Sequence, residues 1–282
     1  MNKVAFITGA SRGIGRETAL AFARAGFDVA ISARTLEEGE SHQHALRNPD
    51  GTPLAGSLAA TAAAIRELGR QAFVVRMDLL DGESVCAACA AVLEHFGRID
   101  VLVNNAIYQG SDLNLPFLEL EADTLLRVYQ GYLLAPFLAT RAVLPQMLER
   151  GDGVIINVTS GAGESDPPVA AGHGGWGYAY GAGKATVSRL SGVLTTELGE
   201  RGIRAFTLNP GVVTTEALKA TIGDQGVIAL RRGVAPPEVP AQVMLWLATA
   251  PEAGQFQKRT IAAQPFALEQ GIVADWRAPA GA

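Results

Sequence analysis

Residues 3–26 read KVAFITGASRGIGRETALAFARAG, a short apolar run followed by a glycine-rich turn and a segment of helical periodicity. Gly9, Gly13 and Gly15 allow a phosphate group to approach the backbone without interference from a Cβ, and the N–H groups that open a helix bind it. The spacing is G-x-x-x-G-x-G, not the general G-x-G-x-x-G fingerprint. A tight turn without a ligand is the alternative, but the flanking strand and helix favour a nucleotide site.

Five further β-rich apolar runs lie at residues 28–32, 71–77, 100–105, 153–160 and 203–209. Helical patterns alternate with them near residues 13–25, 57–69, 82–96, 121–149, 178–201 and 237–249. Continuous apolarity indicates strands covered on both faces, as right-handed βαβ crossovers produce. The predicted fold class is therefore α/β, a doubly wound parallel sheet with helices on both faces.

Three stretches do not fit this alternation: residues 36–56, residues 161–177 and the tail from about residue 251. The first two are rich in glycine, proline and polar residues, so we expect long loops. The length of 282 residues predicts one large domain or at most two. We expect a single domain over residues 1–282.

The chain carries 28 acidic and 23 basic side chains and a net charge of −5, which offers no general attraction to nucleic acid or anionic lipid. Neither a membrane-spanning apolar run nor a signal peptide is evident, so we expect a cytoplasmic protein. Cys86 and Cys89 share one helix face. No further cysteine pair or spaced histidines accompany them, so we predict buried small residues and no metal site.

Tyr180 and Lys184 are four residues apart in a segment that reads as a helix start. This spacing places both side chains on one helix face, where an ammonium can lie beside the same bound molecule as a phenol. Chance pairing of these residue types remains an alternative for the pair alone.

The ordered set of motifs resembles the short-chain dehydrogenase/reductase family from residue 3 to about residue 215. It comprises TGASRGIG at residues 8–15, Asn104-Asn105-Ala106, the strand ending in Ser160, the Tyr180/Lys184 pair and Asn209-Pro210-Gly211. The resemblance implies a Rossmann-like domain that binds NAD(H) or NADP(H) at the carboxyl ends of its strands. It also implies a homodimer or homotetramer and a small-molecule carbonyl or alcohol substrate.

By this resemblance, Tyr180 is the catalytic acid/base, Lys184 its partner and Ser160 the hydroxyl that binds the substrate oxygen. A free phenol has a pKa of about 10, and a nearby cation lowers it. Ser160 donates to the oxygen as negative charge develops there. The positions that match the family's cofactor contacts are Gly9, Ser11, Arg12, Gly13, Ile14, Gly15, Arg34, Asp78, Leu79, Asn104, Asn105, Ala106, Tyr180, Lys184, Pro210, Gly211, Val213 and Thr215.

The end of the second strand favours NADP(H) over NAD(H). An acid near this point accepts the ribose 2′-OH of NAD, whereas an arginine accommodates the 2′-phosphate of NADP. This chain has Ala33 followed by Arg34, and Arg12 lies inside the glycine turn. Solvated surface arginines are the alternative interpretation. Glu37 and Glu38 lie too far along the chain to replace the missing acid.

Two substitutions depart from the family pattern. Ile107 stands where Asn-Asn-Ala is usually followed by glycine. The family's helical asparagine, which helps carry protons to solvent, aligns with Tyr132, and Gln130 is the nearest amide.

The third departure is the distance between Ser160 and Tyr180, which are 20 residues apart, several more than is usual in the family. The extra residues form a loop over the mouth of the site. In that loop His173, Trp176 and Tyr178 either contact substrate or pack the loop down.

The leading hypothesis is an NADP(H)-dependent oxidoreductase that interconverts a carbonyl compound and an alcohol. A non-catalytic NADP(H)-binding sensor or scaffold is the alternative, suggested by the altered helical asparagine and the long insert. Retention of Ser160, Tyr180 and Lys184 argues against it, because a binder needs no proton donor.

Overall fold

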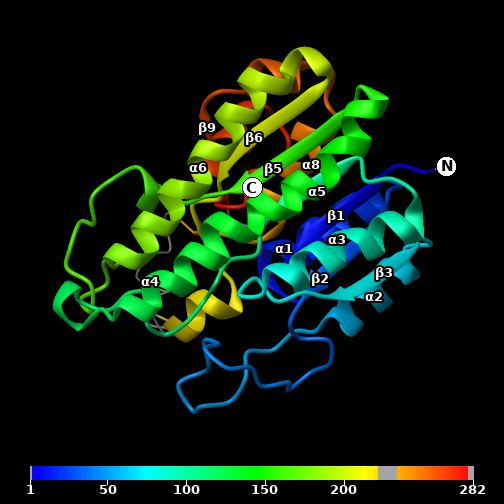
Figure 1. Cartoon of the computed structure of the whole chain (residues 1–282). Helices are drawn as coiled ribbons and strands as arrows, with labels where there is room; N and C mark the ends of the chain where they lie inside the picture. Colours follow the sequence, from blue (N-terminus) through cyan, green and yellow to red (C-terminus); the bar gives the residue numbers. More distant parts are fainter. Residues whose placement is uncertain (1, 222–233, 279–282) are drawn as a thin grey trace.

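The computed structural model describes residues 2–221 and 234–278. Seven parallel strands form one sheet in the order β3-β2-β1-β4-β5-β6-β9, and Figure 1 shows its twist. The predicted Rossmann-like α/β fold is confirmed. The strands are β1 (Val4–Thr8), β2 (Asp28–Ala33), β3 (Ala72–Arg76), β4 (Val101–Asn104), β5 (Gly153–Val158), β6 (Ile203–Asn209) and β9 (Thr260–Ala262).

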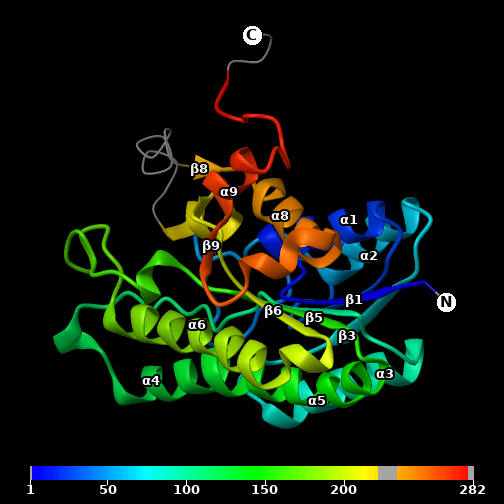
Figure 2. The same ribbon diagram turned by 90° about the horizontal axis from the view of Figure 1, so that it is seen from above.

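Helices cover both faces of the sheet, as Figure 2 shows. One apolar core lies beneath α1 (Gly13–Arg24), α2 (Leu58–Glu67), α8 (Glu238–Thr249) and α9 (Ala263–Glu269). The other lies beneath α3 (Gly82–Phe96), α5 (Ala135–Arg150) and α6 (Tyr178–Leu198). Strands such as β5, in which every residue is buried, show why their sequences are apolar throughout.

The helix predicted over residues 121–149 is interrupted. It consists of α4 (Ala122–Val128), a π-helical segment Tyr129–Leu134 and α5. The π segment has six residues, and apolar residues continue through it, so such a short change of phase does not stand out in the sequence pattern. Its consequence is local, because it inserts Tyr132 into the interior, where that side chain is 1% exposed.

The C-terminal part of the chain contributes a strand that the sequence did not predict. Pro251–Phe256 form a 3-10 helix, and β9 then pairs with β6 before α9. The strand has only three residues, of which one is buried, so it lacks an apolar run long enough to recognise. Residues 279–282 of the predicted tail lie outside the described residues.

Residues 36–56 contain no helix or longer strand, only an isolated bridge between Arg47 and Pro53. Residues 161–177 contain one 3-10 turn and a second bridge. Both segments are therefore loops. On α3, Cys89 is buried as predicted, whereas Cys86 is exposed.

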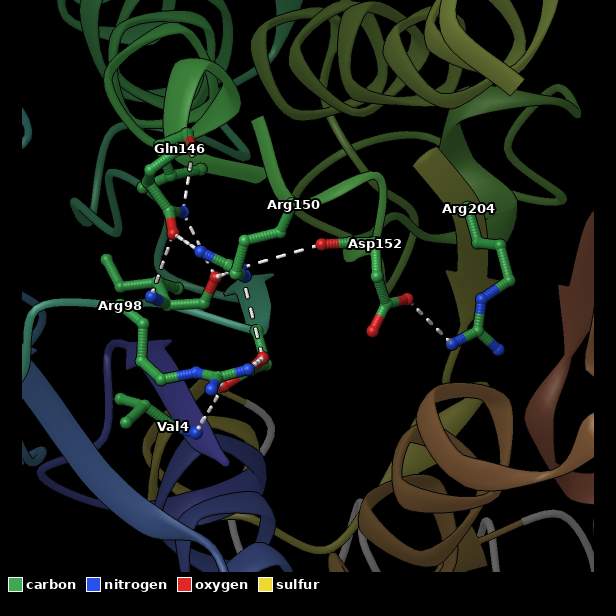
Figure 3. Close-up of polar contacts among 9 residues, drawn as sticks. Val4, Arg98, Gln146, Arg150, Asp152 and Arg204 are labelled. Carbon is green, nitrogen blue, oxygen red and sulfur yellow. Dashed lines mark hydrogen bonds and ion pairs between the residues drawn. The ribbon is translucent and has the colours of Figure 1, made fainter. Parts of the chain in front are cut away.

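The amino-terminal edge of the sheet is closed by ion pairs (Figure 3). The Asp100 carboxylate accepts hydrogen bonds from the Val4 backbone N–H at 2.7 Å and from Arg98 Nε at 2.9 Å. Arg150 Nη2 lies 3.8 Å from the same carboxylate. Asp100 is 4% exposed, so its charge is balanced in place rather than solvated.

Within residues 2–221 and 234–278, no helix is long and apolar enough to cross a membrane. No cluster of three or more His, Cys, Asp or Glu side chains in residues 2–221 and 234–278 is arranged to hold a metal ion.

Candidate active site

A cavity of about 950 Å³ lies at the opposite, carboxyl-terminal edge of the sheet. The glycine turn, the residues after β4, β5 and β6, and the loops at residues 36–56 and 161–177 all contribute to its wall. Most residues predicted for the site lie on this wall: Gly9, Ser11, Arg12, Gly13, Ile14, Gly15, Arg34, Asp78, Leu79, Asn105, Ala106, Ser160, Tyr180, Lys184, Pro210, Gly211, Val213 and Thr215.

Asn104 is the exception, because its side chain turns away from the cavity. The side chain donates to Thr140 Oγ1 at 3.1 Å and to Asn157 Oδ1 at 2.9 Å. Asn157 in turn donates to Ser191 Oγ at 2.9 Å. This buried chain of hydrogen bonds connects β4, β5, α5 and α6, so the structure gives Asn104 a bracing position.

The glycine turn requires glycine for two different reasons. Gly9 and Gly13 have φ values of 70° and 53°, which a residue with a Cβ adopts only with strain. Gly15 has an ordinary φ, but a Cβ there would lie 2.2 Å from the Gly9 carbonyl oxygen. The start of α1 is thereby pressed against the end of β1, with N–H groups facing the cavity.

Asn105 holds the turn from the neighbouring strand. Its Nδ2 donates to the Thr8 carbonyl at 2.9 Å, and Thr8 Oγ1 accepts from the N–H groups of Asn105 and Ala106 at 3.1 and 3.0 Å. These bonds fix the ends of β1 and β4 relative to each other. A cradle of this shape, in which Gly9 and Gly13 have positive φ and Gly15 lets α1 begin close to β1, fits the pyrophosphate of a dinucleotide.

Ser160 and Tyr180 lie together on the wall of the same cavity. Ser160 follows β5 and accepts from the Ala162 N–H at 3.3 Å, while Tyr180 lies in the first turn of α6. Burial raises the pKa of Tyr180, and a hydrogen bond with the Ser160 side chain opposes that rise. The direction differs from the lowering expected from the sequence, because the phenol is far more buried than the residue spacing reveals.

Lys184 lies one turn further along α6 and is 4% exposed. Its Nζ donates to the Val158 carbonyl at 2.9 Å. Burial lowers its pKa to about 7. No carboxylate in the described parts of the chain pairs with this ammonium, whose nearest aromatic rings are Tyr132 at 5.7 Å and Tyr180 at 6.0 Å.

The basic residues predicted to contact the ribose are held by the loop at residues 36–56. Arg12 Nε donates to the Ala55 carbonyl at 2.7 Å, and its Nη2 donates to the Leu54 and Gly56 carbonyls at 3.1 and 2.9 Å. Arg34 Nη1 donates to the Gln43 carbonyl at 3.0 Å. Both guanidinium groups line the cavity and keep further N–H groups for a ligand.

Sequence reasoning missed the contribution of this loop to the cavity wall. Ser41, His42, Leu46 and Arg47 all line the cavity, and the Leu46 N–H donates to the Gln109 carbonyl at 2.9 Å. The loop therefore reaches the segment after β4. Its composition signals a loop but carries no indication of where it folds.

Of the three candidates in the second loop, only Trp176 faces the cavity. Tyr178 is 57% exposed and packs edge-to-face on Phe117, with ring centroids 5.9 Å apart. His173 is exposed and does not line the cavity. The loop is anchored where the Gly177 N–H donates to Asn114 Oδ1 at 3.0 Å.

Comparison with known proteins agrees with this geometry. A family model described as "short chain dehydrogenase" matches residues 3–226. The "Short chain dehydrogenase mpl6" of Monascus purpureus is 32% identical over 250 residues, covering 87% of this chain and 75% of that protein.

Two solved structures are also similar. A 7α-hydroxysteroid dehydrogenase complexed with NADH and 7-oxo glycochenodeoxycholic acid superposes with a TM-score of 0.75 at 28% identity, covering 92% of each chain. A metagenomic short-chain oxidoreductase in complex with NADP superposes with a TM-score of 0.67 at 28% identity. That match covers 92% of this chain and 96% of the other.

Proposed function

This chain belongs to the short-chain dehydrogenase/reductase family, and we propose that it is an NADP(H)-dependent oxidoreductase that interconverts a ketone or aldehyde and the corresponding alcohol. The observation that carries this proposal is the convergence of Ser160, Tyr180 and Lys184 on the cavity that also contains the glycine turn. A protein that only binds the nucleotide has no use for a partly buried phenol and a buried ammonium on the wall of that cavity.

The roles of the three side chains follow from their placement. A bound nicotinamide supplies or accepts the hydride. During reduction, Tyr180 gives its hydroxyl proton to the substrate oxygen, and during oxidation it takes that proton back. Ser160 donates a hydrogen bond to the same oxygen as its negative charge develops. Lys184, when charged, favours the tyrosinate by the proximity of opposite charge and binds the ribose hydroxyls of the cofactor.

The preference for NADP(H) rests on the adenosine end. Ala33 leaves no acid for a ribose 2′-OH, and Arg12 and Arg34 line the cavity there. Glu40 also lines it, but its carboxylate lies 3.2 Å from Arg76, so a guanidinium already balances its charge. We expect NADPH to bind at least tenfold more tightly than NADH, a difference of about 1.4 kcal/mol that one charge-assisted phosphate contact supplies.

The test combines binding with turnover. Fluorescence titration measures the dissociation constants of NADPH and NADH, and NADPH oxidation is followed with a panel of ketones and aldehydes of different size. Equal dissociation constants refute the cofactor preference. Tight binding without reduction of any carbonyl compound would show the sensor or scaffold instead.

We also propose that the chain forms one domain and assembles as a homodimer or homotetramer, as the family resemblance implies. A single cooperative unfolding transition tests the first proposal. Sedimentation equilibrium tests the second.

A further inference from the structure

The buried Tyr132 is the least explained side chain near the site. It lies in the π-helical segment Tyr129–Leu134 and is 1% exposed. Its hydroxyl has no hydrogen-bond partner among the residues that the structure describes. An unpaired buried hydroxyl is unfavourable, so hydrogen bonding does not account for the presence of tyrosine at this position.

The ring of Tyr132 fits closely against α6. A Cβ on Gly183 would lie 2.7 Å from Tyr132 Cδ1 and 2.9 Å from its Cγ, so only glycine leaves room for the ring there. On the other side of the segment, a Cβ on Gly131 would lie 2.6 Å from Tyr108 Cβ. The ring is thus packed directly against the residue that precedes Lys184, and the backbone of its own segment lies close to Tyr108.

Few groups stabilise the charged form of Lys184. Besides the Val158 carbonyl at 2.9 Å, its Nζ has the ring of Tyr132 at 5.7 Å and that of Tyr180 at 6.0 Å. The two rings meet edge-to-face, with centroids 6.4 Å apart and an interplanar angle of 88°. The electron-rich face of an aromatic ring attracts a cation at such distances, most strongly away from water.

We propose that Tyr132 is a positioning residue whose aromatic ring holds Lys184 in its charged form beside Tyr180, while its hydroxyl takes no part. The inference rests on the proposed function, in which Lys184 is the partner of Tyr180. In this chain an aromatic ring lies beside the lysine, at the position where the family resemblance predicts an asparagine side chain.

The other groups around the pair do not replace this contribution. Tyr180 faces Lys184 from α6, and β5 presents the Val158 carbonyl and, just beyond its end, the Ser160 hydroxyl. Tyr132 also faces Tyr108 and Asp112 in the loop after β4. The Asp112 carboxylate is already paired with Arg127 Nη2 at 2.7 Å and accepts from Tyr108.

The titration of Lys184 is the direct test. The chain has four lysines, Lys3, Lys184, Lys219 and Lys258, so NMR of protein labelled at lysine Cε gives few signals, and Lys184→Met assigns the one of interest. We expect Tyr132→Phe to titrate like the wild type. Tyr132→Leu removes the ring and should lower the pKa of Lys184 by roughly half a unit to one unit.

Tyr129→Leu is the matched control, because Tyr129 lies in the same π-helical segment but is 53% exposed; it should leave the titration unchanged. If Tyr132→Leu does not fold, pentafluorophenylalanine at position 132 keeps a ring and reverses its electrostatic character, and it should lower the pKa of Lys184. The inference is overturned if loss or fluorination of the ring leaves the titration as in the wild type. A shift in Tyr132→Phe as large as in Tyr132→Leu overturns it too.

Kinetics separate this inference from the proposed function. In an active enzyme, the alkaline limb of the pH profile, where Lys184 loses its charge, should move to lower pH with the NMR titration in Tyr132→Leu and stay in place in Tyr129→Leu. If the wild type reduces no carbonyl compound, the proposed function fails, yet the lysine titration still decides whether the ring stabilises the ammonium.

Discussion

The two edges of the parallel sheet differ in what their side chains do. At the amino-terminal edge, the carboxylate of Asp100 joins the Val4 N–H, Arg98 and Arg150 (Figure 3). At the carboxyl-terminal edge, glycines and short polar side chains surround a cavity of about 950 Å³. All strands point the same way, so one edge can be closed for stability while the other binds ligands.

This difference predicts a separation of effects. Substitutions at the amino-terminal edge should lower the free energy of unfolding and leave the kinetic constants unchanged. Substitutions at the carboxyl-terminal edge should change binding or rate. The glycine turn lies at the boundary, because Gly15 both packs α1 on β1 and forms the cradle.

Tyr180→Phe should have the largest effect and affect only catalysis. Loss of the hydroxyl removes proton transfer, a contribution of roughly 10²–10⁴ in rate, while the ring that packs the site remains. NADPH affinity should stay within a few-fold of the wild type. The measurement is steady-state kinetics beside a cofactor titration and a melting curve.

A Tyr180→Phe enzyme that keeps more than about a tenth of the wild-type rate would contradict the mechanism, because loss of a general acid is not so mild. A large fall in melting temperature would show a structural tyrosine instead. Lys184→Ala is the informative companion, since it should weaken both rate and cofactor binding.

Gly15→Ala should weaken both stability and cofactor affinity, and so mark the boundary between the edges. The new Cβ would lie 2.2 Å from the Gly9 carbonyl, and overpacking of this kind costs about 1–3 kcal/mol. Because α1 must move away from β1, NADPH binding should weaken at least tenfold. Chemical denaturation and fluorescence titration measure the two effects.

The control is Gly192→Ala in the middle of α6, where a Cβ meets nothing within 4 Å. There the gain in helix propensity should stabilise the protein by about 0.5–1 kcal/mol, with no change in cofactor affinity. Equal behaviour of the two variants would show that close packing at Gly15 is not what requires glycine.

Most of the fold was predictable because its strands are buried on both faces. Every residue of β5 is buried, and a continuous apolar run of this kind can be recognised from the sequence alone. The short β9 was not predictable, since only Ile261 of its three residues is buried. The π-helical segment was missed because it has only six residues, too few for its change of phase to stand out from the helical pattern around it.

The candidate site divides in the same way. The glycine turn and the Tyr180/Lys184 pair depend on neighbours in the sequence, so spacing reveals them. The carbonyl groups that bind Arg12 lie 42 to 44 residues away, and the wall formed by residues 36–56 depends on how a long loop folds. Spacing also predicts nothing about which of Trp176 and Tyr178 faces inward.

Asp100→Asn should destabilise the protein without affecting catalysis. The carboxylate is 4% exposed and interacts with two arginines and a backbone N–H. Removing its charge leaves Arg98 and Arg150 without their partner, at a cost of about 1–3 kcal/mol because both guanidinium groups are partly solvated. Urea denaturation measures the loss of stability. If kcat/KM changes while the folded fraction stays the same, the two edges are not separate in function.

Trp176→Ala should have the smallest effect and should depend on substrate size. Trp176 lines the cavity with Leu113 and Pro168, and its indole lies beside Gly181 of α6, where a Cβ would be 3.5 Å from Trp176 Cδ1. A bulky cyclic ketone such as decalone buries apolar surface against the indole, whereas acetone is too small to cover it. Removing the indole should therefore lower kcat/KM for decalone about tenfold, equivalent to about 1.4 kcal/mol, and leave kcat/KM for acetone nearly unchanged.

Tyr178→Ala is the matched control two residues away, because that ring packs on Phe117 outside the cavity. If Tyr178→Ala changes the ratio of the two substrates as much as Trp176→Ala does, the effect comes from the loop as a whole and not from the wall of the cavity.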